Sequence, residues 1–200
     1  IAWDSARKVA VLFGGSNSAG TLYQDTWEWN GSQWTLLNPA HKPIARNGHA
    51  MVYDQARARI VLFGGTSTNP TRLRDTWEFT GTDWVQSSPT NYPSARTDHA
   101  MAYDAVRQRV VLFGGVTTVR LNDTWEWDGS NWSQVTAAIS PSARYASATA
   151  FDPTRSRVVL FGGSTPSGEA NDLWEYDGLT WAQIIPTGGQ LPTPRRAHSV

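Results

Sequence analysis

The chain has 200 residues, with 17 acidic and 17 basic side chains and no cysteine. Its formal net charge of zero excludes a global field that would draw in nucleic acid or an anionic membrane, and the lack of cysteine excludes disulfides and Cys-ligated metals. The longest apolar runs are too short to span a bilayer and no signal peptide is recognisable, so we expect a soluble protein whose compartment stays open. The chain starts without Met, so we expect a mature or excised segment.

Short β-type runs follow one another along the chain, separated by turn residues. In residues 49–87 they are "HAMVYD", "RIVLFGG", "DTWEF" and "DWVQ", which are β-branched or aromatic and bounded by Gly, Pro, Asn and Asp. A tight Asp-x-x-Arg turn joins the first two, and a Gly turn of the hairpin kind joins the last two. No stretch has a helical period, so these runs predict antiparallel strands.

This pattern occurs four times. The motif "LFGG" recurs at a spacing of about fifty residues, with its Phe at positions 13, 63, 113 and 161. A Trp-containing run, a Gly-x-x-Trp element and a Pro-x-x-Arg lead-in follow each copy in register. We therefore divide a single domain, residues 1–200, into units of about 1–50, 51–100, 101–148 and 149–200. Four antiparallel strands in each unit are typical of a β-propeller blade.

These units resemble the kelch family. The resemblance is carried by the double glycine after an apolar strand, the Trp strand about a dozen residues later and the "P-x-x-R-x-x-H" lead-in, in four copies that cover essentially the whole chain. It implies an all-β, kelch-type propeller of four four-stranded antiparallel blades. "HAMVYD" would be the innermost strand and the Gly-x-x-Trp strand the outermost.

Two features depart from the family pattern. Kelch propellers usually have six or seven blades, whereas this chain supplies four. Val200 aligns with Met51, so the inner strand of the first blade is split between residues 196–200 and residues 1–4. Either the two ends meet in a four-bladed ring, or each completes a blade with another chain as a head-to-tail homo-oligomer such as a dimer. Whether the segment was cut from a longer propeller also stays open.

The repeated aromatic and acidic residues are interpreted as structural. All eleven Trp residues fall in repeated columns, which favours packing between blades over a carbohydrate-stacking platform. The repeated Asp and Glu of the Trp strand are expected to form ion pairs with Arg59, Arg109 and Arg157. The Asp-x-x-Arg turns are expected to be turn caps.

The Arg of the lead-in supplies the leading candidate site. Arg46, Arg96, Arg144 and Arg195 would lie near one mouth of the central channel, together with the variable loops 16–24, 66–74, 116–122 and 164–171. In kelch proteins that bind acidic motifs this Arg pairs with carboxylates, so the resemblance implies capture of an anionic small molecule or acidic peptide. The alternative is that these Arg residues only bond adjacent loops. Further ligand candidates outside the repeated columns are Tyr23, Arg74, Arg120 and Tyr145.

His49, His99 and His198 suggest a second function. Three imidazoles around one axis would suit a divalent metal such as zinc, and a metal-assisted hydrolase acting on a phosphate ester is the alternative function. Against it, no His-x-x-x-His pair occurs. A carbohydrate-binding or sugar-mutarotase-like propeller is a further alternative. No catalytic residue is identified, and no nucleotide-binding motif is present.

Overall fold

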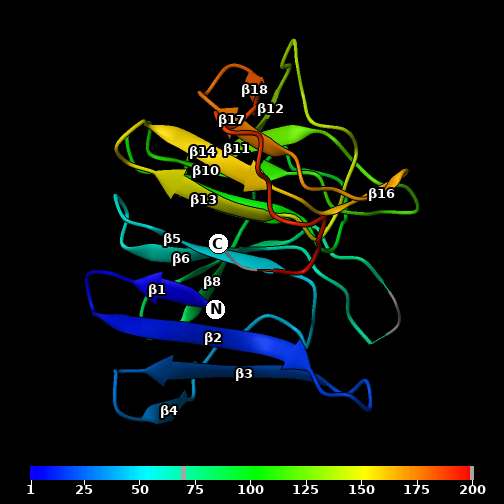
Figure 1. Cartoon of the computed structure of the whole chain (residues 1–200). Coiled ribbons are helices and arrows are strands. Elements are labelled where there is room, and N and C mark those ends of the chain that lie inside the picture. Colours follow the sequence, from blue (N-terminus) through cyan, green and yellow to red (C-terminus); the bar gives the residue numbers. More distant parts are fainter. Residues whose placement is uncertain (69–70, 199–200) are drawn as a thin grey trace.

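The computed structural model describes residues 1–68 and 71–198, which form four four-stranded antiparallel sheets (Figure 1). Each sheet follows one sequence unit and is called a blade. Blade 1 contains β1 (Ala2–Asp4), β2 (Val9–Ser16), β3 (Leu22–Trp29) and β4 (Trp34–Leu37). Blade 2 contains β5 (Ala50–Asp54), β6 (Arg59–Phe63), β7 (Thr76–Phe79) and β8 (Trp84–Ser87). Blade 3 contains β9 (Ala100–Asp104), β10 (Arg109–Phe113), β11 (Thr124–Trp127) and β12 (Trp132–Val135).

Blade 4 contains β13 (Ala148–Asp152), β14 (Arg157–Phe161), β17 (Leu173–Tyr176) and β18 (Trp181–Ile184). Its β14–β17 loop carries a fifth, two-stranded sheet of β15 (Ser164–Thr165) and β16 (Gly168–Glu169). The predicted all-β propeller of four blades is confirmed. Within the described residues there is no helix long and apolar enough to cross a lipid bilayer.

The turn between the two inner strands of each blade is shaped by its Asp. In blade 1 the Asp4 carboxylate accepts hydrogen bonds from the backbone N–H groups of Ala6 and Arg7, at 3.1 and 3.0 Å. These bonds cap the turn locally, as Asp side chains commonly do. Lys8, the next residue, has a φ of 57°, which closes the hairpin. The expectation that the Asp-x-x-Arg sequences are turn caps is confirmed.

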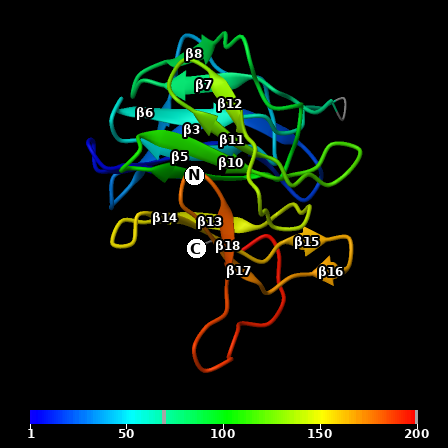
Figure 2. The same ribbon diagram turned by 90° about the horizontal axis from the view of Figure 1, so that it is seen from above.

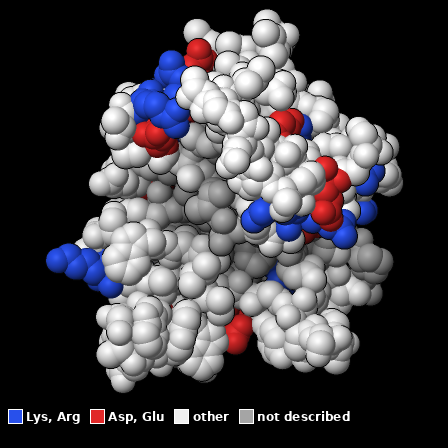
Figure 3. Space-filling model, viewed as in Figure 1, with Lys and Arg blue, Asp and Glu red and all other residues white. Residues whose placement is uncertain are grey.

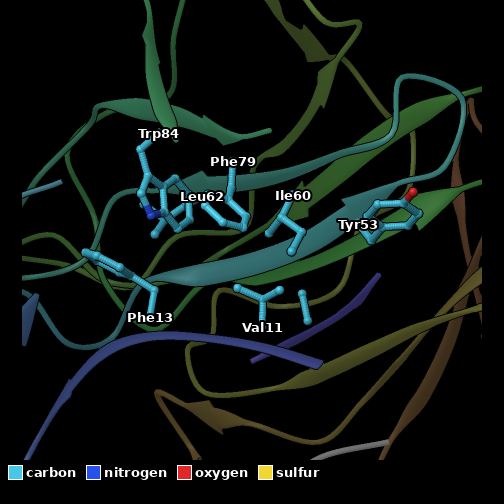
Figure 4. Close-up of a cluster of buried hydrophobic side chains, with 8 residues drawn as sticks. Val11, Phe13, Tyr53, Ile60, Leu62, Phe79 and Trp84 are labelled. Carbon is cyan, nitrogen blue, oxygen red and sulfur yellow. The ribbon is translucent and has the colours of Figure 1, made fainter. Parts of the chain in front are cut away.

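The hydrophobic core lies between blades, in three clusters. Val11 and Phe13 of blade 1 pack against Ile60, Phe79 and Trp84 of blade 2, as Figure 4 shows. Equivalent clusters join blade 2 to blade 3 and blade 3 to blade 4. Blades 2 and 3 thus bury one face against the preceding blade and the other against the following blade, which is why their strands are apolar on both sides.

The outermost Trp of each later blade belongs to this core. Trp84, Trp132 and Trp181 are at most 1% exposed. Each indole donates a hydrogen bond to a Thr hydroxyl of the preceding blade, at 2.9 to 3.0 Å; the acceptors are Thr26, Thr76 and Thr124. The interpretation of these Trp residues as packing between blades is confirmed. Trp34 of blade 1, on which no other blade of the described residues packs, is 47% exposed.

In Figure 1 blade 1 lies at the bottom, blade 2 above it, and blades 3 and 4 overlap in the upper part of the view. The view from above in Figure 2 separates the turn ends of the blades from the end that carries β15 and β16. Among the described residues, no core cluster joins blade 4 back to blade 1. The predicted split strand involves residues 196–200, of which 199 and 200 lie outside the described residues. β1 pairs with β2.

Candidate functional site

Three of the four lead-in Arg residues are buried at the joints between blades. Arg46, Arg96 and Arg144 are at most 1% exposed. Each guanidinium forms a bidentate pair with an Asp of the next blade, at 2.6 to 2.8 Å; the partners are Asp75, Asp123 and Asp172. Each also donates to the carbonyl of a motif glycine in that blade. Their charge is therefore already matched by a carboxylate of the protein.

Two of the Asp partners, Asp75 and Asp172, have a lowered pKa because of their Arg. Burial alone would raise the pKa of Asp75, but the hydrogen bonds and charge of Arg46 outweigh it and hold this pKa below its usual value. The same balance, with Arg144, lowers the pKa of Asp172. The three Arg–Asp pairs act as ties between blades. Arg195 differs, since it is exposed and forms no ion pair within the described residues.

The Glu residues of the Trp strand also find Arg partners, but not those expected. Glu28, Glu126 and Glu175 pair with the Arg of the Asp-x-x-Arg turns, namely Arg7, Arg107 and Arg155. The predicted partners were wrong: Arg109 and Arg157 donate to the backbone carbonyls of Gln108 and Ser156, at 3.0 Å. The turn projects its Arg across the sheet toward the Trp strand, which the linear repeat does not reveal.

The three candidate metal-binding histidines do not converge. His49, His99 and His198 each pack edge-on against a Phe of the blade just before them in the chain, with ring centroids 5.4 to 5.7 Å apart. Burial lowers the pKa of His49 to about 3, and that of His99 well below its usual value, so both imidazoles are neutral. In residues 1–68 and 71–198, no three His, Asp or Glu side chains are placed to hold a metal. The predicted three-histidine site is therefore not formed.

The double glycines explain this placement. At Gly64, a Cβ atom would lie 2.7 Å from the carbonyl of Arg96 and 3.2 Å from the His99 ring. At Gly65, with a φ of +98°, it would lie 2.6 Å from the carbonyl of Asn47. The two glycines thus let the lead-in chain pass against the sheet from both sides. The Arg and His of the lead-in are fixed by this close approach.

A cluster of cations lies at the loop end of blades 3 and 4. The Arg120 guanidinium lies over the Tyr145 ring, 5.3 Å from its centroid, and Arg196 donates to the Tyr145 hydroxyl at 2.9 Å. Arg196 also approaches Glu169 at 3.3 Å. Figure 3 shows basic and acidic side chains gathered on the side where β16 lies. A hydrogen bond with Ser164 and the charges of Arg196 and Arg120 lower the pKa of Tyr145, so this site favours negative charge.

A protein-family model described as the KLHDC2/KLHL20/DRC7 Kelch-repeats domain matches residues 2–200. The chain belongs to the kelch-repeat family. The resemblance inferred from the double glycines and the Trp strands is confirmed. Kelch domains typically bind protein partners, so membership indicates a protein-binding propeller. A search of curated proteins found no match.

The remaining candidate residues of this kelch domain are dispersed. Arg74 stacks on Tyr92, 4.6 Å from the ring centroid, beside a cavity of 290 Å³ on blade 2. Tyr23 accepts a hydrogen bond from Asn17 at 3.2 Å, in the loop of blade 1. Only Arg120 and Tyr145 of the predicted loop residues meet in one cluster. The sequence reasoning missed Arg196, although it breaks a column otherwise filled by Asn47, Thr97 and Tyr145.

The channel along the kelch axis holds a cavity of 520 Å³. Residues from all four inner strands line it, among them Trp3, Met51, Tyr103 and Phe151. No ionisable Asp, Glu, His, Lys or Arg is among the described residues of this lining. The cavity therefore offers no acid–base pair, and the charged site lies in the loops instead.

Proposed function

We propose that this kelch domain is a binding propeller that captures carboxylate groups of an acidic peptide, or of an anionic small molecule, at the loop end of blades 3 and 4. The supporting observation is that Arg120 and Arg196 both contact Tyr145. Two cations thus contact one phenol at the surface of the molecule. Arg guanidinium groups bind carboxylates through paired, charge-assisted hydrogen bonds.

The site has unused capacity for a ligand. Within the described residues Arg120 makes no ion pair. Arg196 has Glu169 as its partner, but both side chains are about half exposed, at 49% and 47%. Exposed pairs of this kind contribute little, so an incoming carboxylate can displace Glu169 at low cost. By contrast, Arg46, Arg96 and Arg144 would have to break a buried pair, and the site proposed for ligand therefore excludes them.

The test is binding of a labelled Glu-rich peptide, measured by fluorescence anisotropy. Arg120→Ala and Arg196→Ala should each weaken binding by roughly tenfold, the effect of losing one charge-assisted contact. Arg109→Ala, at the opposite end of β10, is the matched control and should leave affinity unchanged. Equal affinity of all three variants, or equal binding of a Lys-rich peptide, would overturn the proposal.

We also propose that the domain associates head to tail with a second copy. The supporting observation is the exposed apolar face of blade 1, where Trp27, Trp34 and Leu12 line a cavity of 340 Å³. The equivalent faces of blades 2 to 4 are buried by the preceding blade. Light scattering over a range of concentrations tests this: the mass should rise to that of a dimer.

A further inference from the structure

The three joints between blades use one repeated set of contacts. An Arg of the lead-in pairs with an Asp of the next blade, and a Phe meets the outer Trp of that blade edge-on at 5.1 to 5.2 Å. The Arg of the inner turn lies over the last aromatic ring of the next Trp strand, at 5.2 to 5.9 Å; the pairs are Arg7–Phe79, Arg57–Trp127 and Arg107–Tyr176. Each joint therefore has a donor blade and an acceptor blade.

The free face of blade 4 carries the donor half of this set; we call it the trailing face, made by Phe161, Arg155 and Arg195. Arg195 is held in the same way as its buried equivalents. Its Nε and Nη2 donate to the carbonyl and hydroxyl of Thr193, at 3.0 and 2.9 Å. Arg144 makes the same two bonds to Ser142, at 3.0 and 2.9 Å. The Arg195 guanidinium is thus oriented for a carboxylate that blade 4 does not supply.

The free face of blade 1 carries the acceptor half; we call it the leading face, made by Asp25, Trp29 and Trp34. Asp25 accepts from the Trp27 indole at 2.7 Å, as the paired Asp residues of the other blades do from theirs. The rings of Trp29 and Trp34 lie 5.6 Å apart at 42°. The buried pair Trp127–Trp132 has nearly the same geometry, 5.5 Å and 40°. The leading face is therefore preformed before anything covers it.

We propose that the trailing and leading faces are the two halves of a fourth joint, which a second copy of this chain completes with Arg195 on Asp25, Arg155 over Trp29, and Phe161 against Trp34. This inference rests on the proposed head-to-tail association and not on the anion site. The Arg, Asp and aromatic residues of each half are the same residue types as in the three joints within the chain, or close to them, so opposite charges and aromatic rings would meet in the fourth joint. Two copies would close through two such joints into one ring of eight blades.

One contact of the fourth joint differs. Leu173 stands where Thr26, Thr76 and Thr124 accept the indole hydrogen bond of the following blade. The Trp34 indole therefore finds no hydroxyl in the second copy. Trp29 would keep its own hydrogen bond to the preceding blade. The residues at its position in blades 3 and 4, Trp127 and Tyr176, donate to Glu78 and Glu126 of the blade before them. The equivalent acceptor for Trp29 is Glu175 of the second copy.

The glycines give an independent marker of the joint. A Cβ atom on Gly65 or Gly115 would collide with the lead-in of the preceding blade, at 2.6 to 2.8 Å. A Cβ atom on Gly15, the equivalent residue of blade 1, meets nothing within 4 Å. In the assembly this space would be filled by the lead-in of the second copy around His198. At Gly15, whose φ is +99°, a methyl group would therefore carry only backbone strain in the lone chain, and would also collide with the lead-in of the second copy in the assembly.

The experiment is analytical ultracentrifugation of the 200-residue chain and its variants. Trp34→Ala removes the leading face and Arg195→Glu reverses the charge of the trailing face; both side chains are exposed, so folding should be retained. Each variant alone should associate roughly tenfold or more weakly than the unmodified chain. Mixed together they should form a dimer, because the intact trailing face of one meets the intact leading face of the other. Gly15→Ala should also weaken association, and Val106→Ala, an exposed residue of blade 3, is the matched control.

The outcomes separate the two proposals. A dimer that forms equally well with Trp34→Ala, Arg195→Glu and Gly15→Ala would overturn this inference but keep the association. Variants that fail to combine on mixing would also overturn it. An unmodified chain that stays monomeric at every concentration would overturn both, and would indicate further blades of a longer polypeptide as the occupant of the two faces.

Discussion

At the scale of single residues, the buried Arg–Asp pairs are the most demanding feature of this fold. Placing three guanidiniums at 0–1% exposure is costly unless each is paired and fully hydrogen-bonded. Here each guanidinium has a bidentate carboxylate and a backbone carbonyl as partners, so the contacts within the joint offset the free energy lost by removing the guanidinium from water. The same residue type at position 195 is exposed and has no ion pair within the described residues.

Replacing Arg96 by Ala should destabilise the fold strongly. The change leaves Asp123 and the carbonyl of Gly114 without their donor. Breaking one side of such a pair typically costs about 3 kcal/mol in the free energy of unfolding. Urea unfolding measures this, with Arg109→Ala as a control expected within about 0.5 kcal/mol of the unmodified chain. A loss at position 96 no larger than the control would contradict the role assigned to the pair.

The buried histidines make stability depend on pH. His49 has a folded pKa of about 3 and a usual value of 6.5, so below pH 6.5 the unfolded chain binds a proton that the folded chain refuses. Stability is therefore full above pH 6.5 and falls with decreasing pH, by about 1.4 kcal/mol per unit for this group. His99 acts in the same direction.

Urea unfolding between pH 7 and pH 5, above the range in which carboxylates titrate, tests this dependence. His49→Gln should reduce the slope of unfolding free energy against pH while leaving the contribution of His99. An unchanged slope would show that His49 is charged, and hence hydrated, in the folded state.

At the scale of elements, the double glycine after each second strand determines how the lead-in chain passes the blade. The first glycine of a pair, such as Gly64, lies against the lead-in that follows its blade in the chain. The second, such as Gly65, lies against the lead-in that precedes its blade. A side chain at either position would push apart strands that carry the Arg and His residues. The double glycine thus allows two backbone segments to approach closely, and it does not act as a phosphate-binding loop.

Gly65→Ala should destabilise the protein more than Gly20→Ala. Both positions have a positive φ, of +98° and +83°, so both substitutions carry backbone strain of about 1 kcal/mol. Only at Gly65 does the added Cβ also meet the carbonyl of Asn47, at 2.6 Å, while nothing lies within 4 Å at Gly20. We expect a further loss of about 1–3 kcal/mol at Gly65, measured by thermal or urea unfolding. Equal losses would mean that the close approach relaxes without cost.

At the scale of the whole molecule, stability is shared between neighbours. The core consists of three clusters, each between adjacent blades, so inner blades are packed on two faces and end blades on one. Proteins of this kind behave as a chain of units coupled to their nearest neighbours. The two end blades are therefore the least protected parts of the fold.

Hydrogen exchange should show this gradient. In dilute solution the amides of β3 in blade 1 should exchange faster than those of β11 in blade 3, because local opening is easier where one face is exposed. At concentrations where the fourth joint forms, the protection of β3 should approach that of β11. Mass spectrometry of peptides from the two strands measures both. Equal protection in the monomer would mean that the blade–blade clusters contribute little to stability.

The repeat predicted most of the fold. Four in-register copies of "LFGG" with their Trp strands placed every blade, since a β strand alternates faces and a repeated column must occupy one face in every copy. The candidate site was predicted less well. Arg46, Arg96, Arg144 and the histidines were assigned to a channel mouth, but the three Arg residues, His49 and His99 lie between blades, and His198 lies against blade 4, because the double glycines hold the lead-in against the sheet.

The sequence by itself determined the blade type, the number of blades and the structural role of the Trp residues, because these follow from periodicity within one chain. Only the tertiary structure decided which Asp each Arg meets, since the pairs join residues 27 to 29 positions apart on different blades. It alone also revealed the meeting of Arg120, Tyr145 and Arg196, and the complementary end faces. This cluster and these faces depend on how the blades pack against one another, and the order of residues along the chain does not give the distances between packed blades.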